Sequence, residues 1–236
     1  MSVEQGQMDM GETASLSLQR ETARFNMIEQ QIRTWEVLDG TVLDLLKQVP
    51  REAFVPQQYA GLAFADLEIP IGHGHGQTML SPKMEGRILQ ALEIKKTDKI
   101  LEIGTGSGYL TALLAKLAKH VYSIEIIGDL SHIAQQRLAQ QHIENVTLEV
   151  GDAAKGWPVH APYDVIVYTG SLPVAPDAVL QSLAIGGRMF VVTGEAPVMQ
   201  ATMIDRISAD SFKHDVLFET CLPSLSNAPQ PERFQF

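Results

Sequence analysis

The chain has 236 residues, 45% of them hydrophobic and 19% charged, so it is long enough for one large domain and too apolar to be disordered. Lys and Arg number 18 against 28 Asp and Glu, and the net charge of −10 argues against a protein that grips nucleic-acid phosphates. The single cysteine excludes an internal disulfide, and no apolar run approaches the ~20 residues of a membrane span.

The N-terminal region is predicted to begin with a mobile polar tail over residues 1–19. This tail lacks the basic start and apolar core of a secretory signal, so we expect a cytoplasmic protein. A helix is predicted over residues 20–35, with one apolar face that belongs to the core or to a dimer contact. That face consists of residues spaced by three and four: Phe25, Ile28, Ile32 and Trp35.

Two further helices are predicted before residue 99. Asp39 can cap a helix that buries Val42, Leu45, Leu46 and Val49 and ends at Pro50. Residues 51–71 contain two prolines and are expected to be extended or irregular, and the glycine-rich residues 72–77 have no regular structure. Ser81 is predicted to cap the next helix, with Pro82 at its first position.

From residue 99, short apolar runs alternate with amphipathic stretches. This alternation predicts an α/β fold with a parallel sheet and helices on both faces. Strands are expected at 100–103, 121–125, 146–150, 164–168 and 189–193, and helices at 107–119, 130–141 and 176–183, the last of which stops at Gly186-Gly187. Residues 201–207 and 216–220 flank a turn signal and predict an antiparallel hairpin at the sheet edge.

A glycine loop gives the strongest local signal. Gly104, Gly106 and Gly108 follow a predicted strand and open a helix, an arrangement that lets backbone approach a ligand closely. Tyr109 stands where a dinucleotide fingerprint needs glycine or alanine, and there is no Walker lysine. The loop alone is therefore consistent with either a nucleotide site or a tight turn.

Two carboxylates favour the nucleotide site. Glu125 ends the next strand, 125 − 104 = 21 residues after the first glycine, where an acid can accept both hydroxyl hydrogens of a ribose. Asp152 follows the third strand and could lie beside an adenine. Each acid alone could be a solvated strand end, but ligands bind where the carboxyl ends of such parallel strands meet.

Several stretches resemble the S-adenosylmethionine-dependent methyltransferases, and more closely the protein-L-isoaspartate O-methyltransferase family. The resemblance covers about residues 25–225 and depends on the segments 49–56, 70–74, 76–78, 101–109, 121–125, 145–147, 151–152, 156–158 and 186–188. The most specific segments are Arg-Glu-Ala-Phe-Val-Pro at 51–56 and Gly-His-Gly-Gln-Thr at 74–78. The resemblance implies a Rossmann-like class I fold, a mostly parallel doubly wound sheet of about seven strands, with an antiparallel C-terminal hairpin and an N-terminal helical extension.

The resemblance also implies a cofactor, S-adenosyl-L-methionine. Its methionine part would lie over the glycine loop, its ribose beside Glu125, and its adenine beside Asp152 and Ala153. The full implied set is Glu102, Gly104, Thr105, Gly106, Ser107, Gly108, Glu125, Asp152 and Ala153. A helical and substrate-loop region (20–98), a cofactor-binding core (99–225) and a C-terminal tail (226–236) would then form a single domain.

The acceptor in that family is the free carboxylate of an L-isoaspartyl residue in a damaged protein, whose methylation starts repair. A carboxylate is ionised near neutral pH, so no general base is needed. Thr78, Leu80 and Ser81 are the candidate catalytic residues, which would contact the acceptor carboxylate. The family usually has Gly-Gln-Thr-Ile-Ser here, so Leu80 replaces a serine. A methyltransferase with a different acceptor and a non-enzymatic cofactor-binding protein are therefore the alternatives.

The remaining candidates have simpler interpretations. His73 and His75 lack a third ligand, so no metal site is predicted. Trp157 is expected to pack against the core, and Cys221 to be a small buried residue. The expected partner is a protein or peptide substrate, with no nucleic acid and no membrane, and the chain is expected to be a monomer or a homodimer.

Overall fold

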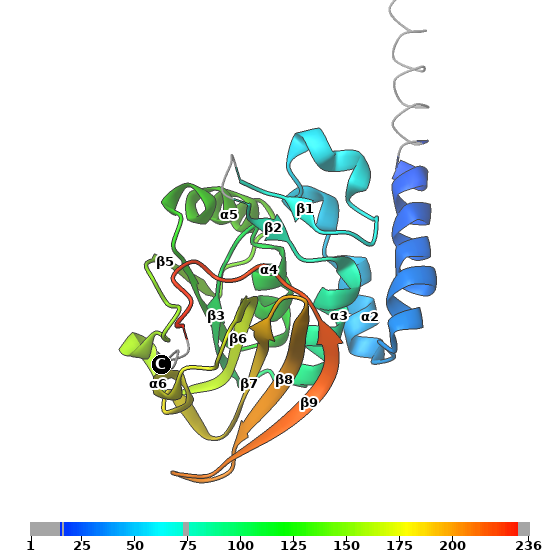
Figure 1. The fold of residues 1–236 in the computed structure, drawn as a ribbon. Coiled ribbons are helices and arrows are strands. Elements are labelled where there is room, and N and C mark those ends of the chain that lie inside the picture. The colour runs from blue at the N-terminus through cyan, green and yellow to red at the C-terminus, as the bar shows by residue number, and fades with distance from the viewer. Residues whose placement is uncertain (1–14, 16, 73–75, 231–236) are drawn as a thin grey trace, which may run out of the picture.

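The sheet of the computed structural model, which describes residues 15, 17–72 and 76–230, confirms the predicted α/β architecture (Figure 1). Its seven strands lie in the order β5-β4-β3-β6-β7-β8-β9, parallel up to β7 and antiparallel from β7 to β9. They are β3 (Lys99–Ile103), β4 (His120–Glu125), β5 (Val146–Val150), β6 (Tyr163–Leu172), β7 (Leu183–Glu195), β8 (Val198–Arg206) and β9 (Phe212–Thr220). The predicted C-terminal hairpin is therefore present at the sheet edge.

Side-chain alternation along the strands divides the core into two clusters on opposite faces of the sheet. In β3, Ile100 belongs to one cluster, and Leu101 and Ile103 belong to the other. The first face is covered by α2 (Gly40–Gln48), α3 (Pro82–Leu92), α4 (Tyr109–Leu117) and part of α5 (Gly128–Gln140). The second face is covered by α6 (Asp177–Leu180) and by loop and C-terminal residues. No described helix is long and apolar enough to cross a membrane.

The N-terminal helix differs from its predicted apolar face. Residues 17–26 are α-helical, Met27–Ile32 form a π-helical turn and Arg33–Trp35 a 3₁₀ turn. Ile28 and Ile32 are buried as expected, whereas Phe25 is 59% and Trp35 46% exposed. Met27 is buried in their place, so the buried stripe consists of Met27, Ile28 and Ile32 and follows the i to i+5 repeat of the π-turn.

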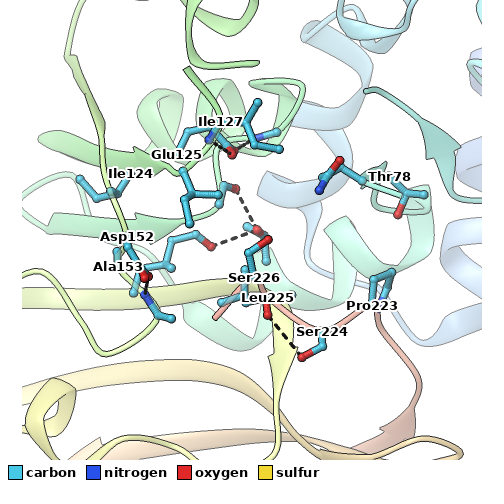
Figure 2. Close-up of a pocket in the computed structure, with 18 of the residues that line it drawn as sticks. Thr78, Ile124, Glu125, Ile127, Asp152, Ala153, Pro223, Ser224, Leu225 and Ser226 are labelled. Atoms are coloured by element: carbon cyan, nitrogen blue, oxygen red, sulfur yellow. Dashed lines mark hydrogen bonds between the residues drawn. The ribbon is translucent and has the colours of Figure 1, made fainter. Parts of the chain in front are cut away.

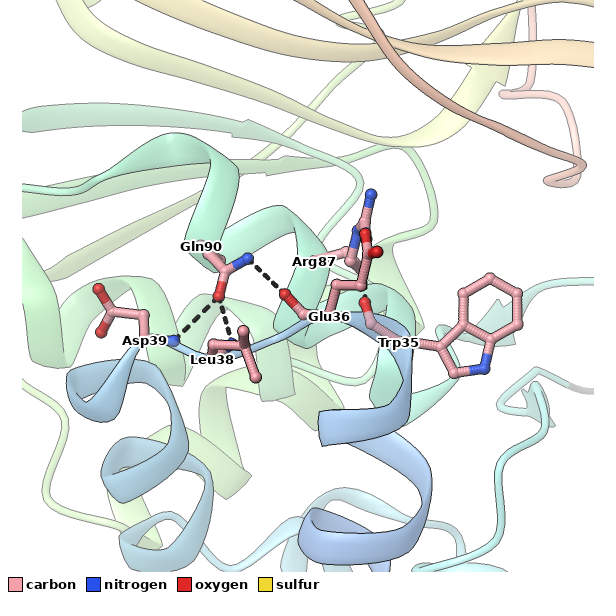
Figure 3. A network of polar contacts seen from close by, with 6 residues as sticks. All are labelled: Trp35, Glu36, Leu38, Asp39, Arg87 and Gln90. Atoms are coloured by element: carbon pink, nitrogen blue, oxygen red, sulfur yellow. Dashed lines mark hydrogen bonds and ion pairs between the residues drawn. The ribbon is translucent and has the colours of Figure 1, made fainter.

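The chain then turns at Glu36, whose φ is 61°, and a polar network fastens this turn to α3 (Figure 3). Gln90 Oε1 accepts hydrogen bonds from the backbone N–H groups of Leu38 (2.7 Å) and Asp39 (3.0 Å). Its Nε2 donates to the Glu36 carbonyl oxygen at 2.8 Å. The Asp39 carboxylate accepts from the N–H groups of Thr41 and Val42, which confirms it as the cap of α2.

The region between α2 and α3 contains tight turns where the sequence predicted extended or irregular chain. Two 3₁₀ helices occur, Arg51–Phe54 and Gln57–Leu62. After these turns, β1 (Ile69–Pro70) and β2 (Thr78–Met79) pair antiparallel in a two-stranded sheet. His73 and His75 lie outside the described residues, as does most of the predicted polar tail. This small sheet carries the chain to the start of α3.

Two predicted boundaries on the second face are wrong. The helix at 176–183 is a single turn that ends at Leu180, and Gly186-Gly187 lies inside β7 instead of stopping a helix. Gly186 has a φ of 80°, and a Cβ on Gly187 would lie 2.9 Å from the Ala184 carbonyl oxygen. The two glycines therefore permit a bulge in β7, where its register with β6 shifts.

The C-terminal segment, defined here as residues 221–230, continues the fold past the predicted core boundary at 225. It runs from β9 back across the carboxyl ends of the central strands (Figure 1). The Ser171 N–H donates to the Pro223 carbonyl oxygen (2.9 Å), and the Leu225 N–H donates to the Ser171 carbonyl oxygen (3.0 Å). Cys221 is exposed, which corrects its predicted burial, because it stands where the chain leaves the sheet edge.

Candidate active site

A cavity opens where the carboxyl ends of β3, β4, β5 and β6 meet (Figure 2). The loops after three of these strands contribute to its wall, with Gly104 and Gly106 after β3, Ile127 after β4, and Asp152 and Ala153 after β5. β6 contributes Thr169 and Gly170 from within the strand. Two segments from outside these loops complete it, Thr78 and Leu80 on one side and Pro223–Ser226 on the other. The cavity therefore lies where ligands bind in parallel α/β sheets.

The glycine loop is held in a backbone conformation that requires glycine. Gly104, Gly106 and Gly108 all have positive φ values, of 97°, 54° and 84°. A Cβ on Gly104 would lie 2.2 Å from the hydroxyl oxygen of Thr169, which donates to the Gly104 carbonyl oxygen at 2.8 Å. A side chain on this loop is thus excluded by both strain and contact, and its main chain faces the cavity.

Glu125 joins two of the loops around the cavity. Its side chain is 5% exposed, and its Oε2 accepts the Gly106 N–H at 2.9 Å while its Oε1 accepts the Ile127 N–H at 3.0 Å. A carboxylate has about four acceptor positions, so each oxygen retains capacity for a further donor. The predicted ribose acceptor is therefore at the cavity wall and fixed in orientation.

Asp152 is also fixed in the cavity wall. Its Oδ1 accepts the N–H of Ala154 at 3.0 Å, and its Oδ2 accepts the side-chain amide of Asn227 at 2.9 Å. Trp157 packs against Gly151, where a Cβ would lie 2.6 Å from the indole, and it donates to Glu149 at 2.7 Å. The expected packing role of Trp157 is confirmed, and it supports the loop that carries Asp152.

Glu102, predicted at the cofactor, does not reach the cavity. It points to the same face of β3 as Ile100, is 0% exposed, and accepts hydrogen bonds from Thr111 (2.5 Å) and Ser123 (2.6 Å). Burial raises its pKa to about 8, and the two hydroxyl donors offset only part of this effect. Strand alternation explains the difference, because it directs the side chain of residue 102 onto one face of the sheet instead of toward the cavity at the strand ends.

Three other predicted residues do not line the main cavity. Thr105 and Ser107 line a smaller adjoining cavity, which shares Gly104 and Gly106 with the main one. Gly108 begins α4, where a Cβ would lie 3.1 Å from the Cβ of Ala134. The predicted residues that the structure brings together are Gly104, Gly106, Glu125, Asp152 and Ala153, with Thr78 and Leu80.

The segment around β2 separates two surfaces. Leu80 lines the main cavity, whereas Ser81 lines a different groove with Trp35, Arg87 and Phe218. Ser81 occupies the N-cap position of α3, as predicted, but its hydroxyl makes no capping hydrogen bond. The structure therefore does not bring Ser81 to the cavity that holds Thr78 and Leu80.

Arg51 fixes the main chain of this segment. It is 1% exposed, donates from Nη2 to the Leu80 carbonyl oxygen (2.7 Å) and from Nε to the Ala63 carbonyl oxygen (2.9 Å), and forms a buried ion pair with Glu85. Burial raises the pKa of Glu85 to about 7, against the opposing effect of the Arg51 guanidinium. The sequence does not predict this role for Arg51, because its buried partners lie 12 to 34 residues away along the chain.

The C-terminal segment is the other contribution that sequence reasoning missed. Its residues 222–230 lack periodicity and have two prolines, so no pattern indicated that they would contact the strand ends. Within the described part of the chain, no group of three or more His, Cys, Asp and Glu side chains is arranged to hold a metal.

Comparisons with known proteins agree with this geometry. The family model for protein-L-isoaspartate(D-aspartate) O-methyltransferase matches residues 22–226. A protein-L-isoaspartate O-methyltransferase 2 from Pelobacter propionicus is 39% identical, covering 84% of this chain and 88% of the relative. A protein-L-isoaspartate O-methyltransferase 1 from Rhodopseudomonas palustris is 38% identical, covering 93% and 91%.

Among solved structures, a Plasmodium falciparum protein resembles the fold with a TM-score of 0.73 at 20% identity, covering 88% of this chain and 98% of the other. It is described as a protein-L-isoaspartate O-methyltransferase in complex with S-adenosyl-L-homocysteine. Another protein-L-isoaspartate O-methyltransferase structure gives a TM-score of 0.75 at 22% identity, covering 88% of this chain and 66% of the other.

Proposed function

Because the chain belongs to the protein-L-isoaspartate O-methyltransferase family, we propose that it transfers a methyl group from S-adenosylmethionine to the free carboxylate of L-isoaspartyl residues in damaged proteins. The observation that carries this proposal is the meeting of two sets of residues at one cavity. Glu125 and Asp152 lie in its wall together with Thr78 and Leu80. A cofactor and an acceptor could therefore occupy the same space.

The residues around the cavity fit the cofactor. Gly104 and Gly106 expose main chain to the methionine part, and Glu125 retains acceptor capacity for the ribose hydroxyls. Asp152 would accept from the amino group of the adenine, beside Ala153. When bound, S-adenosylmethionine supplies an electrophilic methyl group on its sulfonium sulfur.

The residues of the chain mainly have to align the acceptor with the methyl group of the cofactor. An isoaspartyl carboxylate has lost its proton near neutral pH, so no side chain needs to remove one. Thr78 and Leu80 would orient the acceptor, and the buried Arg51 would hold their main chain in place. Catalysis would come from orientation and exclusion of water.

The regions divide accordingly. We assign residues 99–225 to cofactor binding, extended to Asn227 by its contact with Asp152, and residues 20–98 to the acceptor side. The net charge of −10 supports a protein acceptor over nucleic acid. We propose a cytoplasmic location, and a monomer or homodimer.

One observation favours a second candidate, a methyltransferase of this family with a different acceptor. Leu80 lines the cavity without offering a hydrogen bond, at the position where the family's serine is expected. The two candidate functions can be separated with a pair of peptides. One carries an isoaspartyl residue, and the other has the same sequence with ordinary aspartate. We expect methyl label from the cofactor to enter only the isoaspartyl peptide, as a base-labile ester.

Label that enters proteins of a cell extract but neither peptide would support the different acceptor. Binding of S-adenosylhomocysteine with no transfer to any acceptor would indicate a non-enzymatic cofactor-binding protein. Failure to bind S-adenosylhomocysteine at all would contradict both methyltransferase proposals.

A further inference from the structure

Asn227 in the C-terminal segment does not line the cavity, but it bonds a carboxylate that does. Its side-chain Nδ2 donates to Asp152 Oδ2 at 2.9 Å, across 75 residues of sequence. Asp152 lines the cavity, and so do Ser224, Leu225 and Ser226, which lead directly to Asn227. The same segment thus forms part of the cavity wall (Figure 2) and, through Asn227, also holds one of the carboxylates of that wall.

The segment is anchored on both sides of the cavity. On the β6 side, Ser171 exchanges backbone hydrogen bonds with Pro223 and Leu225 at 2.9 and 3.0 Å, and its hydroxyl donates to the Leu222 carbonyl oxygen at 2.9 Å. Leu225 then packs against Gly104 and Gly170, where a Cβ would approach its side chain to 3.7 and 3.0 Å. On the β5 side, the Asn227 bond to Asp152 is the anchor. Residues 223–227 therefore span the cavity from β6 to β5.

The Asp152 carboxylate has one donor on each oxygen. The Ala154 N–H holds Oδ1 at 3.0 Å, and without Asn227 the other oxygen has no protein donor among the described residues. Two donors at different oxygens fix the plane of a carboxylate, whereas one donor leaves it free to rotate. An acceptor with a fixed plane recognises an amino group more strongly than one that must first be ordered.

We infer that Asn227 is a positioning residue, which orients the Asp152 carboxylate to accept the exocyclic amino group of the cofactor's adenine. This inference rests on the proposed function, because it assumes that S-adenosylmethionine occupies the cavity. It goes beyond that function by assigning adenine recognition partly to the C-terminal segment. On this inference the C-terminal segment also contributes to selectivity, because it favours ligands with adenine over ligands whose base lacks the amino group.

The test uses the full chain and two variants suited to the backbone at this position. Asn227 has a φ of 58°, which glycine adopts freely and aspartate tolerates, so Asn227→Gly removes the amide with little strain. Asn227→Asp keeps the shape and places a second carboxylate against Asp152. Gln230→Ala is the matched control, since over the ranges that the structure describes the amide of this exposed residue donates to the Ala228 carbonyl oxygen and to no group of the cavity wall. Thermal melting verifies that each variant is folded.

The readout is calorimetric affinity for two ligands, S-adenosylhomocysteine and its deaminated analogue S-inosylhomocysteine, whose base carries oxygen in place of the amine. We expect Asn227→Gly to weaken S-adenosylhomocysteine binding about five- to tenfold, and Asn227→Asp at least as much. Binding of the inosyl analogue should change less than about twofold, because it offers no amine to Asp152. Gln230→Ala should leave both affinities unchanged.

Two results would overturn the inference. If Asn227→Gly weakens both ligands equally, Asn227 only fastens the segment and does not act through the amine. If neither affinity changes, Asp152 does not depend on Asn227 at all. Failure of the unmodified chain to bind S-adenosylhomocysteine would instead contradict the proposed function, so the two failures are distinguishable.

Discussion

Leu80 and Ser81 are neighbours in the chain, but their side chains face different spaces. Leu80 lines the cavity that contains Glu125, and Ser81 lines the groove that contains Trp35 and Phe218. This division follows from the extended chain before α3, in which successive side chains point to opposite sides. It determines which of the two residues meets an acceptor bound beside the cofactor.

Replacing Leu80 by serine should improve the isoaspartyl reaction. A hydroxyl in the cavity adds a hydrogen bond to the acceptor carboxylate and removes bulk, so Leu80→Ser should raise kcat/KM on an isoaspartyl peptide about fivefold or more. Steady-state kinetics with methyl-labelled cofactor measures this. Leu80→Ala separates the two causes, since it removes the bulk alone. No gain from serine would show that residue 80 does not contact the acceptor.

Ser81→Ala should have little effect on either activity or stability. The Ser81 hydroxyl makes no capping bond, so the free energy of unfolding should change by less than about 0.5 kcal/mol. Asp39→Ala is the contrasting variant, because the Asp39 carboxylate caps α2 through two N–H groups, and it should cost about 1 kcal/mol. Loss of turnover in Ser81→Ala at an unchanged melting temperature would mean that Ser81 enters the acceptor site.

Glu125→Ala should weaken cofactor binding strongly. The substitution removes the proposed acceptor for the ribose hydroxyls and also releases the N–H groups of Gly106 and Ile127. We expect about a ten- to hundredfold loss of affinity for S-adenosylhomocysteine by calorimetry. Glu144→Ala, at an exposed site before β5, serves as the control and should bind normally. Equal affinity in the two folded variants would remove Glu125 from the cofactor site.

Gly106→Val should abolish cofactor binding while the sheet remains folded. Gly106 has a φ of 54°, and a Cβ there would lie 3.1 Å from Ile71, which also lines the cavity. The contrasting variant Gly128→Ala, at the start of α5, has nothing within 4 Å and should be neutral or slightly stabilising. Circular dichroism and calorimetry together check both. Normal binding by folded Gly106→Val would mean that the loop is only a turn.

The buried Glu102 should make stability fall as the pH rises. Its pKa is about 8 in the folded chain against 4.5 for an unperturbed glutamate, so between these values the folded state holds a proton that the unfolded state has released. The free energy of unfolding therefore decreases with rising pH in this window, by at most about 1.4 kcal/mol per pH unit from this group. Unfolding curves from pH 5 to 8 should show a shallower decrease for Glu102→Gln. Parallel pH dependence in the two proteins would contradict the assignment.

Local signals in the sequence predicted the elements that depend on neighbouring residues. The strand, glycine loop and helix around Gly104 are encoded within one short segment, and so is the cap at Asp39. Glu125 and Asp152 could be placed together because parallel strands end at the same edge of a sheet. The first two features need no knowledge of distant parts of the chain, and the placement of the two carboxylates needs only this general rule for parallel strands.

The errors concern residues whose environment is decided by distant contacts or by a change of helical repeat. The contact of Asn227 with Asp152 depends on how β9 returns the chain to the strand ends, which no periodicity encodes. Phe25 followed a regular helical repeat in the sequence, but the π-turn after it shifted the buried stripe. Glu102 required the side-chain direction at the very end of β3, where an error of one residue reverses the face.

The attachment of Arg51 to the carbonyl oxygen of Leu80, and not to its side chain, has an evolutionary consequence. This hydrogen bond does not involve the side chain of residue 80, so it can persist whichever residue occupies the position. A change of acceptor preference in a descendant or an engineered form could therefore arise by a single codon change while Arg51 continues to hold the main chain. A library of all amino acids at position 80, screened against several carboxylate acceptors, would explore this accessible variation directly.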